Sequence, residues 1–192
     1  MTIPKFEPKR LFGIEKIIGT DSIIADYWSW AHSVFDNIER SRFAEFLVHK
    51  AMGETSQTYT NWDNYDVTSP EGIKIEVKAS AYLQSWKQEE LSKISFNIEP
   101  KKSWNPETNT YEEKATRPSN VYVFCLHKHK EQETSNVLDT RQWIFFVLPT
   151  AVLNAKIPEQ KTISLNSLKT LKPQETDYSG LRNTILRVVN QM

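Results

Sequence analysis

A short turn between two strand-like segments constrains the fold of this chain more than any other feature of its sequence. Residues 73–79 (IKIEVKA) alternate apolar and polar side chains, which is typical of a strand with one buried face. Residues 62–67 (WDNYDV) form a second strand-like segment, and residues 69–72 (SPEG) join the two. Proline suits the first position of such a turn, and Gly72 suits the left-handed position that closes a three-residue loop. The sequence therefore predicts a β-hairpin.

The length of the hairpin loop decides which side chains share a face. If residues 70–72 form the loop, the numbers of paired residues add up to 142, and Asp66 lies opposite Glu76. Side chains paired in this way are about 5 Å apart. Lys78 lies one step further along the same face as Glu76. A two-residue loop would instead move Asp66 to the other face, so the predicted Asp–Glu–Lys cluster depends on the turn.

The predicted cluster has the composition of a metal site. Two neighbouring carboxylates repel each other unless a cation lies between them. Oxygen ligands from Asp66 and Glu76, with a nearby backbone carbonyl such as that of Val77, suit Mg²⁺ better than zinc, and Mn²⁺ can substitute. An ammonium group from Lys78 would lie beside the metal, where it could stabilise a phosphoryl oxygen or help to activate the attacking water.

An alternative interpretation of the same residues is an ordinary sheet face in water, with Lys78 paired to one of the acids. The Glu-x-Lys pattern is a weak signal by itself, because it recurs at residues 7–9, 99–101, 112–114 and 159–161. Three of these repeats contain or follow a proline, the repeat at 112–114 lies in a polar stretch, and none lies in a strand-like segment. The strand context of residues 76–78 is what favours a functional site.

A helix is predicted upstream of the hairpin. Asp36 or Asn37 suits its N-cap, and Gly53 suits the position just after its end. Its buried stripe is predicted to contain Phe43, Ala44, Leu47, Val48 and Ala51. Glu45 flanks this stripe and does not face away from it, because residues three and four apart are neighbours on a helix.

The rest of the chain completes the predicted fold class. Further strands are expected at residues 92–98, 120–127 and 142–148, and an amphipathic helix is expected after residue 177. Residues 1–25 are interpreted as an N-terminal arm that packs on the domain, and residues 99–119 as a long flexible loop. A helix, mostly antiparallel strands and a final helix indicate one α/β domain over residues 1–192, with a mixed sheet flanked by helices.

Composition excludes several classes of protein. The chain has 192 residues and carries equal numbers of acidic and basic side chains, which excludes a binder driven by overall positive charge. Its single cysteine excludes an internal disulfide and a multi-cysteine zinc site. None of its five glycines forms a phosphate-binding loop. The absence of a long apolar run and of a signal-like start leads us to expect a cytoplasmic protein without a membrane partner.

The pattern Asp66, Glu76-Val77-Lys78 and an upstream helical glutamate resembles the PD-(D/E)xK superfamily of metal-dependent nucleases, the restriction-endonuclease-like enzymes. The core of that superfamily is a helix, three antiparallel strands, a helix and a strand. Asp66 matches the motif aspartate, Glu76 the second acid and Lys78 the lysine. Glu45 matches a first-helix glutamate that some branches use as a further ligand. Tyr65 stands where the superfamily's name has proline.

The resemblance implies a function. It implies a Mg²⁺-dependent nuclease that hydrolyses phosphodiester bonds, most often in DNA, with the metal held by Asp66, Glu76 and Glu45. Lys78 would position the water, and Gln84 would touch the substrate or the water. Many members of the superfamily are dimers, so a homodimer is also implied. The alternative is a non-catalytic module on the same fold that binds nucleic acid or a protein.

Two longer segments extend the resemblance. AEFLVHKAMG and KIEVKASAYLQSW are similar to a set of uncharacterised bacterial proteins of about this length, in which SAYLQ likewise follows the lysine. Exposed tryptophans beside lysines suit stacking on nucleic-acid bases. The candidates for substrate binding are therefore Trp86 with Lys87, and Trp104 in the polar loop near Lys101 and Lys102, although Trp86 suits core packing equally well.

Overall fold

The computed structural model of the chain describes residues 11–33, 36–53, 64–105 and 108–192. Its main sheet has five strands in the order β1-β2-β6-β7-β9, and only β2 and β6 run parallel. The strands of this sheet are β1 (Val67–Thr68), β2 (Lys74–Ala81), β6 (Val121–His127), β7 (Trp143–Pro149) and β9 (Gln174–Thr176). The predicted class, a mixed and mostly antiparallel sheet flanked by helices, is confirmed.

Both faces of the main sheet are covered. Helices α2 (Asn37–Ala51) and α5 (Leu181–Asn190) pack on one face, where Val77 and Val123 meet Leu47. The other face packs against a two-stranded sheet, β3 (Ser95–Asn97) with β8 (Thr162–Ser164). The short helices α3 (Thr150–Lys156) and α4 (Leu165–Thr170) complete that layer, and two 3-10 turns cover residues 132–134 and 140–142.

The predicted hairpin has the predicted register. Val67 pairs with Ile75 and Thr68 with Lys74, so the numbers of paired residues add up to 142. Gly72 has a φ of +81°, and its N–H donates to the Ser69 carbonyl at 2.9 Å. The first strand is shorter than predicted, because residues 64–66 form bends and residues 62–63 lie outside the described part.

Helix α2 begins and ends as predicted. The Asp36 carboxylate accepts the N–H of Ile38 at 2.8 Å, and Gly53 takes the left-handed conformation after the last turn, with φ +84°. Ala44, Leu47 and Val48 are buried against the sheet, while Phe43 and Ala51 are partly buried beside them. This helix packs against β1 and β2.

The third predicted strand does not join the main sheet. Of residues 92–98, only β3 is a strand, and it pairs with β8 instead of β2. The neighbour of β2 is β6, which runs parallel to it, so the sheet lacks the antiparallel continuation that the superfamily core implies. Every residue of β6 is buried, as expected for a central strand covered on both faces.

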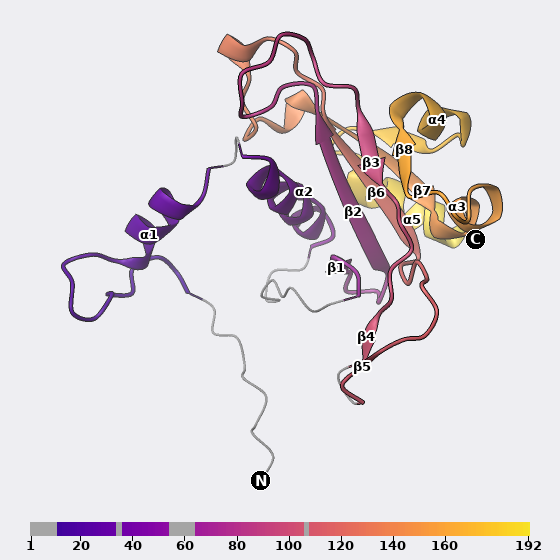
Figure 1. The fold of residues 1–192 in the computed structure, drawn as a ribbon, viewed down its shortest axis with the longest axis horizontal. Helices are drawn as coiled ribbons and strands as arrows, with labels where there is room; N and C mark the ends of the chain where they lie inside the picture. The colour runs from indigo at the N-terminus through magenta and orange to yellow at the C-terminus, as the bar shows by residue number, and fades with distance from the viewer. Residues whose placement is uncertain (1–10, 34–35, 54–63, 106–107) are drawn as a thin grey trace.

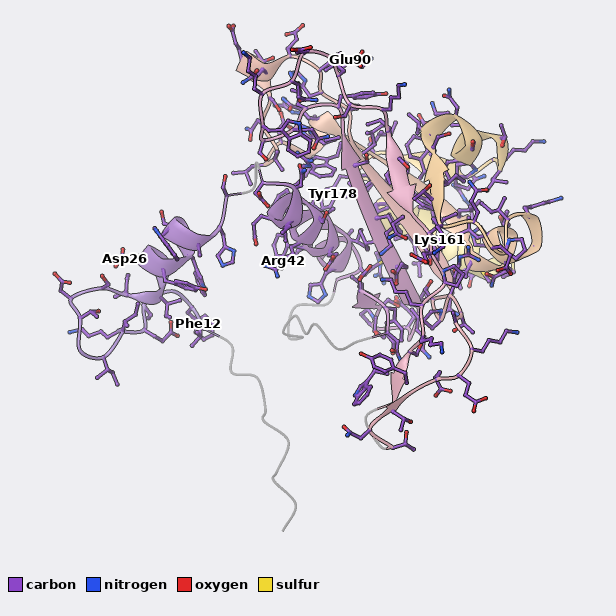
Figure 2. The ribbon with its side chains drawn as sticks, in the orientation of Figure 1. Phe12, Asp26, Arg42, Glu90, Lys161 and Tyr178 are labelled. Carbon is purple, nitrogen blue, oxygen red and sulfur yellow. The ribbon has the colours of Figure 1, made fainter. Side chains whose placement is uncertain are left out.

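Two predicted segments have more structure than expected. Residues 99–119 contain a small hairpin, β4 (Trp104–Asn105) with β5 (Thr110–Tyr111), above a bridge between Lys101 and Thr116. Helix α1 (Ile24–Ala31) begins where the predicted N-terminal arm ends, and it buries none of its residues. Phe12 and Asp26 lie apart from the main sheet (Figure 2). Over the described ranges, no helix is long and apolar enough to cross a membrane.

Candidate active site

Three charged side chains meet beside β2, at the point where β1 begins. The Lys78 ammonium lies 2.6 Å from Glu76 Oε1 and 4.0 Å from Asp66 Oδ2. Glu76 is only 4% exposed and the Lys78 side chain 18%. The interpretation as an ordinary sheet face in water is therefore wrong, because the face that carries Glu76 and Lys78 continues into buried Tyr122 and Phe124 of β6.

Asp66 reaches the cluster because β1 is so short. Regular pairing stops at Val67 and Ile75, so the Val77 N–H has no opposing backbone carbonyl on that side. The Asp66 carboxylate takes this N–H instead, at 2.6 Å. In a strand, the N–H and C=O of one residue point to the same side, so the Val77 carbonyl also faces this open edge. The edge thus offers a carboxylate and a backbone carbonyl side by side.

Glu45 of α2 is the third acid at this edge. Its Oε2 atom is buried and has no hydrogen-bond partner among the described residues. Burial raises the pKa of Glu45 to about 7, helped by the negative charges of Asp66 and Glu76 and opposed by Lys78. Burial and Glu76 likewise raise the pKa of Asp66. The site therefore has an excess of carboxylates over the cations that reach them.

Lys78 keeps its charge in this setting. Burial alone would lower the pKa of Lys78, but the carboxylates of Glu76 and Asp66 together raise the pKa above its usual value. The lysine is therefore a fixed, protonated donor between two acids.

The carboxylates do not yet converge on a common point. Within the described ranges, no group of three or more His, Cys, Asp or Glu side chains is arranged to hold a metal ion. One physical reason is that the ammonium groups of Lys78 and Lys101 both contact Glu76 Oε1. The chemistry of the donors nevertheless fits a hard divalent cation, because the Glu45 Oε2 atom, buried and without a partner in the described part of the chain, lies near two further acids.

The remaining predicted residues lie outside this cluster. Arg40 donates to Gln84 Oε1 at 2.9 Å, and Gln84 donates to the Ala81 carbonyl at 2.8 Å, so the Gln84 amide belongs to a separate network. Trp86 (58% exposed) and Lys87 belong to the loop after β2, which also carries Glu90 (Figure 2).

Trp104 lies elsewhere, stacked edge-on against Tyr111 of β5 with ring centroids 5.0 Å apart. The loop after β2 and the β4–β5 hairpin are at opposite ends of β2 (Figure 1). The structure therefore separates the two predicted groups of substrate-binding residues.

Sequence reasoning placed Lys101 only near Trp104 and missed its contact with Glu76, and it missed Arg40 altogether. Lys101 Nζ lies 3.4 Å from Glu76 Oε1, and Lys101 ends one of the Glu-x-Lys repeats, at residues 99–101. Arg40 is buried and also donates to the Leu83 carbonyl at 3.1 Å. No local pattern identifies either residue, because both act across more than twenty positions of the sequence.

The Glu45 carboxylate should reduce the stability of the metal-free protein at alkaline pH. Its pKa is higher in the folded than in the unfolded chain, so the stability falls as pH rises from about 4.5 to about 7. A shift of this size is worth about 3 kcal/mol for a fully buried group, and we expect about half because solvent reaches part of the side chain. Glu45→Gln should therefore stabilise the chain by about 1–2 kcal/mol at pH 8 and by much less at pH 5. Urea unfolding in a chelator tests this, and equal gains at both pH values would contradict it.

The fold and the cluster first define a class: an α/β protein that gathers acids and a lysine at the open edge of a mixed sheet. The sequence profile of the bacteriophage T4 endonuclease IV family matches residues 15–167, most of the chain. The chain therefore belongs to this family. Membership supports the conclusion that the protein is a nuclease, an enzyme that hydrolyses phosphodiester bonds in nucleic acid. The matched range contains Glu45, Asp66, Glu76 and Lys78. None of the curated proteins matches the chain.

Proposed function

We propose that this nuclease depends on Mg²⁺, cuts DNA and works by PD-(D/E)xK chemistry at the open edge of β2. The observation that carries the proposal is the buried Lys78 ammonium between Glu76 and Asp66, with a Glu45 oxygen that has no hydrogen-bond partner among the described residues. A purely structural ion pair needs only one acid for one lysine. Additional buried acids destabilise a fold unless a cation joins them, so their presence favours a metal site.

The ligands in this proposal are the carboxylates of Asp66, Glu76 and Glu45 and the backbone carbonyl of Val77. When bound, Mg²⁺ would polarise the phosphoryl group and increase the acidity of its water. The Val77 N–H fixes the direction of the Asp66 carboxylate, so this ligand is oriented before anything binds. Glu45 would lose its proton on binding, because its pKa is about 7.

Lys78 has the central role in the proposed reaction. With Glu76 holding the metal, the Lys78 ammonium would be free to donate to a phosphoryl oxygen or to the attacking water. In the metal-free protein the carboxylates of Glu76 and Asp66 raise the pKa of Lys78, so the lysine is protonated before metal and substrate bind, and this ammonium could stabilise negative charge as it develops.

Substrate contacts are proposed on both sides of the cluster. Trp104 lies toward one end of β2 and Trp86 with Lys87 toward the other, so a strand of nucleic acid along this edge would reach both. Gln84 would have to leave Arg40 to touch the substrate, and its role stays a prediction. A homodimer also stays a prediction.

A cleavage assay tests the proposed function. End-labelled duplex, branched and single-stranded DNA and RNA are incubated with the chain and Mg²⁺, Mn²⁺ or a chelator. We expect cleavage of at least one DNA substrate with either metal and none with the chelator. Cleavage that persists in the chelator would exclude metal dependence, and cleavage of RNA alone would correct the substrate. If nothing is cut although DNA is bound, the chain is a binding module.

A further inference from the structure

A second lysine reaches the candidate site from a different part of the chain. The Lys101 ammonium lies 3.4 Å from Glu76 Oε1, the same oxygen that Lys78 contacts at 2.6 Å. One carboxylate oxygen thus carries two ammonium groups, while Glu45 Oε2 has no partner among the described residues. Lys101 belongs to the excursion of residues 99–119, whose two ends are close together beside this edge of the sheet.

The backbone of Lys101 is held firmly although its side chain is 63% exposed. Its N–H and C=O both bond to Thr116, each at 2.9 Å. Arg117, which follows Thr116 in the sequence, is buried. Its guanidinium donates to the Ile98 carbonyl at 2.8 Å and to Asn154 Oδ1 at 2.9 Å. Lys101 therefore lies at the anchored base of the excursion, from which a long side chain can move without any change in the fold.

We infer that Lys101 is a second basic residue of the active site, which leaves Glu76 when a divalent cation binds there and then binds a phosphate oxygen of the nucleic acid. This inference rests on the proposed function. A divalent cation attracts the Glu76 carboxylate more strongly than a hydrated ammonium does, so the two ammonium groups lose their common partner. A phosphodiester chain passing the metal is the nearest replacement for that negative charge.

The two lysines have different tasks because their burial differs. The Lys78 side chain is 18% exposed and fixed between two acids, so it acts on the phosphoryl group that reacts. Lys101 is well hydrated and mobile at its tip, so it contributes mainly to holding the substrate. Loss of Lys101 should therefore raise KM and leave kcat nearly unchanged, the opposite of what is expected for Lys78.

The test compares Lys101→Ala with Lys102→Ala, a matched control in which the same residue type is removed one position further on. Lys102 is exposed and makes no ion pair within the described ranges. Without nucleic acid, Mn²⁺ should bind to Lys101→Ala about 2–5-fold more tightly, because a competing cation has gone. With substrate, the KM of this variant should rise about 5–10-fold. The slope of its log affinity against log salt concentration should become shallower by about 1, the amount expected for one lost phosphate contact. Lys101→Arg should restore KM, and Lys102→Ala should leave the Mn²⁺ affinity unchanged.

The outcomes separate this inference from the proposed function. If the wild type cuts nucleic acid but Lys101→Ala matches it in both KM and Mn²⁺ affinity, Lys101 has no role at the site and only this inference is overturned. The inference is also overturned if Lys102→Ala changes KM and Mn²⁺ affinity as much as Lys101→Ala does, because the loss of any nearby positive charge would then explain both effects. If the wild type cuts nothing with Mg²⁺ or Mn²⁺, the proposed function and this inference both fall.

Discussion

Lys78→Ala is expected to lower the turnover of bound substrate about 100-fold or more while nucleic-acid affinity stays nearly unchanged. The Lys78 ammonium lies 2.6 Å from Glu76 and stays protonated, because the two neighbouring acids raise its pKa. Such a group contributes most where negative charge develops in the transition state. One ammonium contributes little to the ground-state binding of a polyanion that several other basic groups also hold.

The stability of this variant must be followed in parallel. Removal of Lys78 leaves buried Glu76 and Asp66 without their main counter-ion, so we expect a loss of about 1–3 kcal/mol in the free energy of unfolding. Lys74→Ala is the matched control: Lys74 lies on the same strand and contacts the Tyr65 ring instead of the acids. Single-turnover rates and nucleic-acid affinities, measured on folded samples of both variants, decide whether Lys78 acts in the chemical step or in substrate binding. If Lys78→Ala weakens binding and leaves the cleavage rate of bound substrate intact, Lys78 is a phosphate clamp.

Glu76→Gln is expected to reduce cleavage by on the order of 10³-fold, because it removes the most buried of the proposed metal ligands. Glutamine has nearly the same shape and can still accept the hydrogen bond from Lys78, so the fold should persist. The lost property is the negative charge that a hard divalent cation requires. A rate assay over a wide range of Mg²⁺ concentrations separates weaker metal binding from a slower chemical step.

Glu175→Gln provides the control for this substitution. Glu175 lies on β9, the opposite edge strand of the main sheet, and its nearest cation is Lys169 at 4.0 Å. It should retain full activity. Full activity of Glu76→Gln would place the metal elsewhere, whereas equal losses in the two variants would point to a general effect on the sheet.

The hairpin was the most predictable part of this molecule. The loop of residues 70–72 determines the register through local backbone geometry, and the alternation in residues 73–79 reports which side chains share a face. Both signals are local, so one sequence suffices to place Glu76 and Lys78 on one face and Asp66 just before the first paired residue. Capping at Asp36 and Gly53 made helix α2 predictable for the same reason.

Features that depend on distant packing were not predictable. The alternation does not reveal that the polar face of β2 is buried, because its cover comes from β3, β8 and their neighbouring helices. The contact of Lys101 with Glu76 requires the excursion to return beside β2, which no local pattern encodes. Gln84 lies six residues after Lys78 in the sequence, but a buried arginine of α2 holds its amide in another network. Helix α1 was missed because its apolar residues are not buried in a core.

Titration of the chain with Mn²⁺ in a calorimeter, without nucleic acid, tests the claim that the open edge of β2 is a metal site most directly. For the wild type we predict binding that strengthens between pH 6 and pH 8, because Glu45, with a pKa of about 7, must release its proton. Glu76→Gln should show no binding, and Glu175→Gln should bind like the wild type. Equal binding by the wild type and Glu76→Gln, or no binding by the wild type at millimolar Mn²⁺, would contradict the account.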